Sequence, residues 1–303
     1  MKIKFMTMGI CAICLLGILT GCAGAPKPDA DIYTGGAYNN KEFDVLFATE
    51  FPVASEKEAL ARAAVAMQEG ETDKALFFYV RALQFNPENV DLLAHIGEIH
   101  MQRNDIVMAK RALLQARMYD PMHARTLEAL GLIYMSDGKD EQAVVELTTA
   151  IANDARLWRT HNALGVYADK NADFVAAQTH YNAALSINPD AAHVINNRGY
   201  SKFLAGDPHG AALDFYEAAK DRGFSQAWAN LGMVYAKQGW YKDALETYQH
   251  VMSEANAYNN TGFAALQNGD LMQAKRFLNE AIRRSPSYFP EAERNLSTLN
   301  DLE

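Results

Sequence analysis

The sequence repeats itself with a period of about 34 residues, within the range of stacked structural repeats, and this period constrains the fold more than any other feature. One series of small residues consists of Ala75, Ala109, Ala143, Ala177 and Ala211. A second, seven positions later, consists of Ala82, Ala116, Ala150, Ala184 and Ala218. A third reads Pro87, Pro121, Ala155, Pro189 and Gly223, and a fourth reads Gly97, Gly131, Gly165 and Gly199. Several series in phase at one period indicate units that stack on their neighbours.

One copy of the repeat carries a recognisable pattern, in which Trp228, Leu231, Gly232 and Tyr235 are followed by Ala244 and Tyr248. This pattern and the period resemble the tetratricopeptide repeat (TPR). The resemblance implies an all-α fold, a superhelical solenoid of about seven helix-turn-helix repeats. The first positions of the repeats are then predicted at Glu56, Val90, Ala124, Trp158, Ala192, Ser225 and Ala255.

The sixth repeat is irregular, because Ser225 and Ala255 are closer together than one full period. Its second helix, around Ala244 to Ser253, is therefore expected to be about one turn short, with a bend or pinch in the stack. The solenoid is predicted to occupy residues 55–288. Residues 289–303 are polar and are expected to form a capping helix and tail, which the end of a solenoid requires.

The N-terminus has the pattern of a targeting segment. Lys2 and Lys4 precede an apolar stretch from Phe5 to Gly21, which is short for a membrane-spanning helix and typical of a secretory signal peptide. Leu19-Thr20-Gly21-Cys22 resembles the lipobox of bacterial lipoproteins. The resemblance implies removal of residues 1–21, lipidation of Cys22 and, with Ala23 next, an outer-membrane location facing the periplasm. The alternatives are a plain cleaved signal and a membrane anchor helix.

The cysteines agree with this interpretation. Cys11 and Cys14 lie inside the signal segment, so Cys22 would be the single cysteine of the mature chain. A disulfide framework, a thiolate metal site and a cysteine nucleophile are then excluded. The formal charge of −9 would become −11 once Lys2 and Lys4 are removed, which disfavours binding to nucleic acid and to anionic lipid surfaces. Residues 22–54 have the composition of a tether, and residues 41–50 are either a short helix capping the first repeat or further linker.

The sequence lacks the motifs of common enzymes: a nucleophile elbow, a phosphate-binding loop, a dinucleotide fingerprint and a zinc-protease helix. His95 and His100 are five positions apart and would point about 140° apart on a helix. No metal and no cofactor is predicted. Glu98 and Glu128 are the only acid or base candidates on the expected binding surface, and the chain is predicted not to be an enzyme.

The expected function is binding along the groove formed by the first helices of the repeats. The early repeats contribute Leu60, Met67, Glu98, Met101, Glu128, Leu132 and Met135 to the groove positions. The later ones contribute Asn162, Asn196, Asn197, Tyr200, Phe203, Asn230, Met233, Asn256, Asn259, Asn260 and Phe263. An asparagine amide can pair with a peptide backbone, and the aromatic residues and Met233 could anchor apolar side chains. Alternatively, these asparagines cap turns or bond within the stack.

The resemblance can be narrowed to one class of TPR lipoprotein. The lipobox, the Asn-Asn-x-Gly openings at Asn196 and Asn259, and the closing stretch AALQNGDLMQAKRFLNEAIRRSPSYFPEAERNL resemble the TadD-type lipoproteins of tight-adherence (Flp pilus) systems. This implies a scaffold that binds a peptide segment of a partner and assists assembly of the outer-membrane secretin. The alternatives are a pilotin of type IV pilus systems, an adaptor for peptidoglycan hydrolases, a glycan-binding module and an envelope enzyme.

Overall fold

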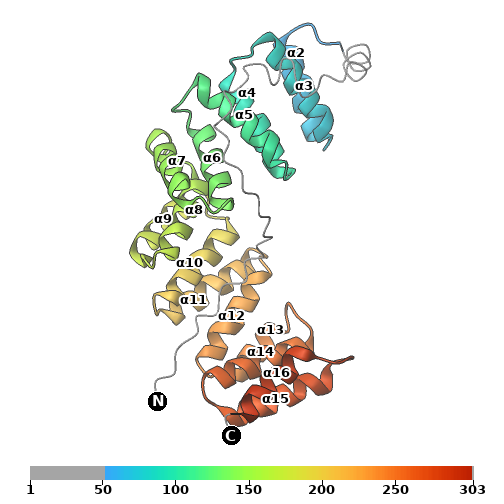
Figure 1. Ribbon diagram of the computed structural model, residues 1–303, viewed down its shortest axis with the longest axis vertical. Helices are drawn as coiled ribbons and strands as arrows, with labels where there is room; N and C mark the ends of the chain where they lie inside the picture. The colour runs from blue at the N-terminus through green and yellow to red at the C-terminus, as the bar shows by residue number, and fades with distance from the viewer. Residues whose placement is uncertain (1–51, 302–303) are drawn as a thin grey trace, which may run out of the picture. The chain divides into compact units, whose positions relative to one another are not determined.

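The computed structural model describes residues 52–301, so Cys22, the signal segment and most of the predicted tether lie outside the described residues. The described chain forms fifteen α-helices, one five-residue π-helix and no strand (Figure 1). The predicted all-α solenoid of helix-turn-helix pairs is confirmed. Within the described range, no helix has the length and apolar character needed to cross a membrane.

Seven helix pairs follow one another along the chain. The first helix of each pair is here called the A helix: α2 (Glu56–Gln68), α4 (Val90–Gln102), α6 (Ala124–Ser136), α8 (Trp158–Lys170), α10 (Ala192–Leu204), α12 (Gln226–Lys237) and α14 (Glu254–Gln267). The second is the B helix: α3 (Thr72–Phe85), α5 (Ile106–Tyr119), α7 (Asp140–Asn153), α9 (Phe174–Ile187), α11 (Pro208–Tyr216) continued by the π-helix η2 (Glu217–Asp221), α13 (Tyr241–Tyr248) and α15 (Leu271–Arg284). The predicted starts match the A helices, with one-residue differences at α12 and α14.

Side-chain caps and left-handed residues fix the ends of the helices. Asp105, Asp173 and Asp207 each cap a B helix by accepting a hydrogen bond from a backbone N–H of its first turn. The turn after each A helix contains a residue with positive φ, at positions 70, 104, 138, 172, 206, 239 and 269. Glycine is the usual residue there because it lacks a Cβ, whereas Asn104 and Ala172 adopt the same conformation with a side chain.

The repeated alanines lie where helices cross closely. All five alanines of each predicted series, such as Ala75 and Ala82, are fully buried. The glycines inside the A helices likewise allow two helices to approach each other closely. A Cβ atom added at Gly165 would lie 2.7 Å from the ring of Tyr181 on the paired B helix, so only glycine fits this crossing. Small residues at these positions therefore set the distance between the helices of a pair.

The sixth repeat differs from the others mainly in its B helix. α12 starts at Gln226 and α14 at Glu254, which is less than one full period, whereas α8 and α10 start a full period apart. α13 has 8 residues and the regular B helices have 14. The shortening is larger than the single turn that the sequence pattern predicted.

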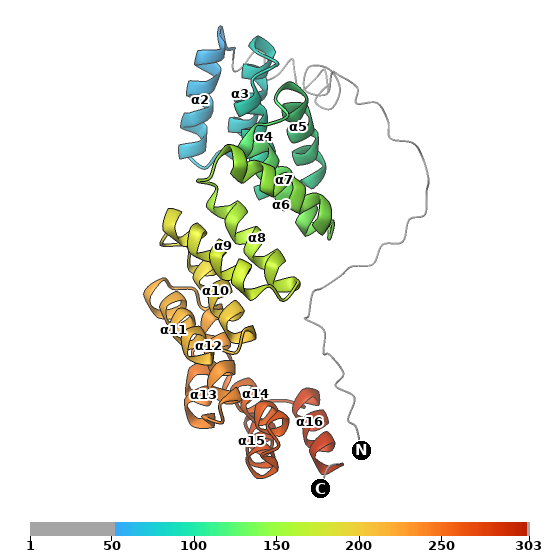
Figure 2. The ribbon, with the colours of Figure 1, turned by 90° about the vertical axis from the view of Figure 1, so that its left-hand side faces the viewer.

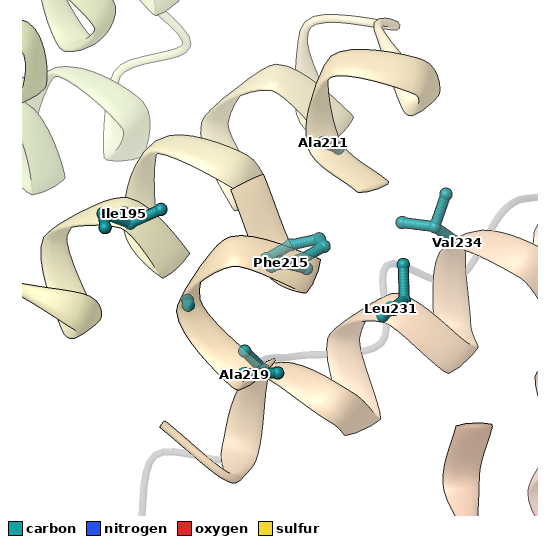
Figure 3. Close-up of a cluster of buried hydrophobic side chains, with 8 residues drawn as sticks. Ile195, Ala211, Phe215, Ala219, Leu231 and Val234 are labelled. Carbon is teal, nitrogen blue, oxygen red and sulfur yellow. The ribbon is translucent and has the colours of Figure 1, made fainter. Parts of the chain in front are cut away.

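The fifth repeat contains the π-helix, which the sequence pattern did not predict. α11 and η2 together span Pro208–Asp221, the usual length of a B helix, and Gly223 follows with a φ of +71°. Phe215, Ala218 and Ala219 pack here against Leu231 and other residues of α12 (Figure 3). The wider helical turn thus coincides with a closely packed junction between repeats.

The series of pairs ends with a single helix. α16 (Pro290–Asn300) packs against both α14 and α15, and the three helices lie beside one another in Figures 1 and 2. It buries Ala292 and Leu299, while Glu291, Arg294, Ser297 and Thr298 are exposed. A helix with one apolar and one polar side is suited to closing the end of a stack.

Candidate peptide-binding face

The predicted binding residues lie on four successive A helices. Asn162 is on α8, three residues are on α10 (Asn196, Asn197 and Tyr200), two are on α12 (Asn230 and Met233), and four are on α14 (Asn256, Asn259, Asn260 and Phe263). Tyr200 and Asn256 are exposed and the others are half-buried. This set is called the amide face. The predicted lipidation site, Cys22, lies outside the described residues.

Several asparagines of the amide face bind one another across neighbouring repeats. Asn197 Nδ2 donates to Asn162 Oδ1 at 3.0 Å, which joins α10 to α8. Asn230 Nδ2 donates to Asn196 Oδ1 at 2.8 Å, which joins α12 to α10. These contacts correspond to the alternative in which the asparagines bond within the stack. Their role in binding a partner stays a prediction.

The series of amide pairs is interrupted beside the shortened repeat. Asn295 Nδ2 on α16 donates to Asn259 Oδ1 on α14 at 2.9 Å, so the pairing resumes at the end of the described chain. Between α12 and α14, the described residues form no such pair. Asn260 Nδ2 instead contacts the sulfur of Met252 at 3.4 Å, and sulfur is a weak acceptor. The side chain of Asn260 is therefore held less firmly than those of the paired asparagines.

A paired asparagine keeps hydrogen-bonding capacity. Each side-chain amide has two N–H donors and an oxygen with two lone pairs, and one pair uses a single donor and a single acceptor site. Because pairing also fixes the orientation of the amide, the remaining groups are presented in a defined direction. Two half-buried apolar side chains, Met233 on α12 and Phe263 on α14, lie on helices that also carry paired asparagines and could contact apolar groups of a ligand.

The preceding A helices are joined by charges in place of amides. Glu128 on α6 is only 2% exposed, and its Oε2 accepts a hydrogen bond of 2.7 Å from Arg159 Nη2 on α8. Its Oε1 accepts bonds from both the backbone N–H and the hydroxyl of Thr160, at 3.2 and 3.0 Å. Both oxygens of this carboxylate are thus engaged, and a buried charge is stabilised by pairing.

Glu98 on α4 extends the same network. Its Oε2 lies 3.8 Å from both Arg125 Nη2 and His95 Nδ1, and its Oε1 lies 3.6 Å from Arg159 Nη2. Burial would by itself raise the pKa of Glu98, but His95 and the two guanidinium groups outweigh it and hold this pKa below its ordinary value. Glu98, Arg125, Glu128, Arg159 and Thr160 are together called the charged network.

The two acid or base candidates therefore lie in ion pairs that connect A helices. Within residues 52–301, no group of three or more histidine, cysteine or acidic side chains is arranged to hold a metal ion. His100, which the repeat pattern places in a core position, is 3% exposed and points its Nδ1 toward Asp105 at 3.6 Å.

The basic partners of this network were not among the residues predicted from the sequence. Arg125 and Arg159 are one full period apart and occupy the second position of consecutive A helices. The period itself would have identified them as neighbours on one face.

Family comparisons agree with this architecture. Profiles described as tetratricopeptide repeat match residues 66–133, 162–224, 225–254 and 255–288. Among curated proteins, human tetratricopeptide repeat protein 6 is 24% identical over 186 residues, which is 60% of this chain and 36% of that protein. The bovine BBSome complex member BBS4 is 26% identical over 153 residues, which is 50% of this chain and 29% of that protein. The chain thus spans about a third of the length of these relatives.

Solved structures share the fold at low sequence identity. PilF of Pseudomonas aeruginosa has a TM-score of 0.53 and 19% identity, covering 71% of this chain and 97% of PilF. A tetratricopeptide repeat protein from Parabacteroides merdae has a TM-score of 0.53 and 14% identity, covering 81% of this chain and 98% of that protein. The helix pairs, the buried small residues and the profile matches lead to one assignment: the chain is a tetratricopeptide-repeat protein.

Proposed function

We propose that this chain is a non-catalytic, lipid-anchored TPR scaffold that binds a peptide segment of a partner protein. The observation that carries the proposal is the amide face. It combines oriented amides on α8, α10 and α12 with the exposed ring of Tyr200 and the partly exposed Met233 and Phe263. The donors and acceptors that these amides have left can bind a peptide backbone, and the apolar side chains can contact its side chains, which suits an extended peptide segment.

The energetics favour a modest affinity. Each hydrogen bond contributes about 0.5–1.5 kcal/mol net, and ordering a flexible segment opposes binding. Apolar anchors must therefore supply much of the binding energy. Attachment of scaffold and partner to one membrane would raise their effective concentration and offset the modest affinity.

We further propose that the partner belongs to a tight-adherence pilus apparatus, with the outer-membrane secretin as the expected binding partner. The support is the sequence resemblance to TadD-type lipoproteins and the lipobox ending at Cys22. A lipid anchor would hold the scaffold on the periplasmic side of the outer membrane, where secretin subunits assemble. Deletion of the gene is expected to reduce secretin multimers and surface pili, and normal secretin assembly would contradict this assignment.

The anchor has its own test. Cys22→Ala is expected to abolish labelling by a fatty-acid analogue, because Cys11 and Cys14 lie in the segment that would be removed. Label retained in this variant would contradict the lipoprotein assignment. A soluble Cys22→Ala chain is expected to restore secretin assembly poorly in the deletion strain.

A second candidate, an adaptor for peptidoglycan hydrolases, uses the same face and the same anchor. Capture of partners from detergent-solubilised envelope separates the two. Recovery of a secretin or pilus component supports the first candidate, whereas recovery of a hydrolase supports the second.

A further inference from the structure

Two histidines of the fourth repeat face each other across its helix pair. His161 is on α8 and His180 is on α9, and their Nδ1 atoms are 3.3 Å apart. The ring centroids are 5.6 Å apart and the ring planes are inclined by 39°. As a hydrogen bond, this contact requires a proton on one Nδ1 and a lone pair on the other. If that ring instead carries its proton on Nε2, the Nδ1 lone pairs of both rings are directed into the same small space.

The spacing of these nitrogens matches that of two ligands on one metal ion. Zinc binds imidazole nitrogen at about 2.0–2.1 Å with tetrahedral geometry, which places two ligand nitrogens about 3.3–3.4 Å apart. Small rotations of the two rings would direct both lone pairs at one ion without separating α8 from α9.

The neutral imidazole is the form that binds a metal. Both side chains are half-buried. A neutral ring can donate a lone pair near neutral pH without first losing a second proton.

The other histidines of the described chain have different neighbours. His95 and His123 contact hydroxyl and carboxylate groups. His193 and His250 lie against tryptophan rings. Among the contacts described for residues 52–301, the fourth repeat is the place where two imidazole nitrogens come together.

We propose that His161 and His180 form a two-histidine site for a divalent transition-metal ion of the zinc type. Since no third protein ligand is grouped with them in the described residues, water or a donor from a bound partner completes the coordination. A site with two protein ligands and open positions binds an exchangeable ion, unlike a closed four-ligand structural zinc site. The ion would link α8 to α9 and stabilise the repeat that carries Asn162.

The test uses the full-length chain, purified in detergent without a polyhistidine tag and freed of metal with a chelator. Titration with ZnCl₂ in a calorimeter is expected to show one ion per chain, and the thermal midpoint should rise with Zn²⁺ concentration. His161→Gln and His180→Gln should each weaken binding by about tenfold or more, because each removes one of two protein ligands. His209→Gln changes an exposed histidine of the next repeat and should bind Zn²⁺ as the unaltered chain does.

A second readout requires no variant. Imidazole nitrogen resonances of the unaltered chain should shift for two histidines when Zn²⁺ is added, and the shifted pair should be His161 and His180. Absence of Zn²⁺ binding by the unaltered chain would overturn the proposal. Binding that persists in both glutamine variants, or resonance shifts confined to other histidines, would overturn it as well.

Discussion

The charged network and the amide face join successive A helices by different chemistry. From α4 to α8, carboxylates and guanidinium groups connect the repeats, and the central carboxylate of Glu128 is buried. From α8 to α12, half-buried asparagine amides make the equivalent connections. A buried charge depends strongly on its partner, whereas a neutral amide can exchange its partner for another hydrogen-bonding group at low cost. The comparison indicates that the charged network stabilises the stack, and it supports the proposal that the amide face accepts a ligand.

The largest expected effect is on the charged network. Glu128→Ala leaves Arg159 and the backbone N–H and hydroxyl of Thr160 without their shared acceptor. The free energy of unfolding should fall by about 2–4 kcal/mol, measured by urea denaturation. Glu141→Ala, at an exposed position of α7, is the matched control and should change stability little. If Glu128→Ala and Glu141→Ala lowered the free energy of unfolding equally, the claim that the buried carboxylate contributes more to stability than an exposed one would be contradicted.

A smaller effect is expected on the amide face. Asn196→Ala removes the acceptor of Asn230 Nδ2, and the unfolding free energy should fall by about 0.5–1.5 kcal/mol. Asn256→Ala, at an exposed position of α14, should be close to neutral. If Asn196→Ala destabilised the chain as much as Glu128→Ala, the amides would be structural to the same degree as the charges.

Ala172 follows α8, the helix on which the charged network and the amide face meet, and a substitution there tests backbone strain without changing either region. Its φ of +57° is unfavourable for a side chain with a Cβ, and Gly138 occupies the equivalent position one repeat earlier with a φ of +72°. Ala172→Gly should therefore stabilise the chain by about 0.5–1 kcal/mol, and Gly138→Ala should destabilise it by a similar amount. Thermal or urea unfolding checks both signs. A destabilising Ala172→Gly would show that the left-handed conformation is not strained there.

The smallest effect concerns pH. The pKa of Glu98 is lower in the folded chain than its ordinary value of 4.5, so its contribution to stability is present above that value and is lost as the pH falls through the folded pKa. Between about pH 5 and pH 3, the thermal midpoint of the unaltered chain should therefore fall more than that of Glu98→Gln. Parallel pH profiles for the two chains would show that Glu98 is not held in its charged form by Arg125, Arg159 and His95.

The repeated part of this fold could be predicted well from the sequence, because each period places small residues at the same helix crossing. The starts of the A helices α2, α4, α6, α8 and α10 follow from the period, as does the burial of Ala75 and its equivalents. The shortening of α13 was underestimated, since the pattern shows missing residues without showing where a helix ends. The π-helix was not predicted because Pro208–Asp221 keeps the usual number of residues.

The helices that carry the amide face could be predicted from the sequence, whereas the contacts between its side chains could not. The period places the asparagines on successive A helices, but it does not say whether two amides are close enough to bind each other. That depends on the separation of the repeats, which the packing of buried residues determines. Asn197 and Asn162, 35 residues apart in sequence, are joined at 3.0 Å because the packing of α10 on α9 brings it into contact with α8 as well.

The most direct test of the central claim uses a photo-crosslinking residue in cells that produce this chain together with the proposed pilus apparatus. Tyr200 is exposed on the amide face and Val175 is 80% exposed on the B helix α9, so each can carry the probe without disturbing an amide pair. Crosslinking from position 200 should capture a partner protein, expected to be the secretin, and position 175 should capture little. Capture from position 175 with none from position 200 would contradict binding at the amide face.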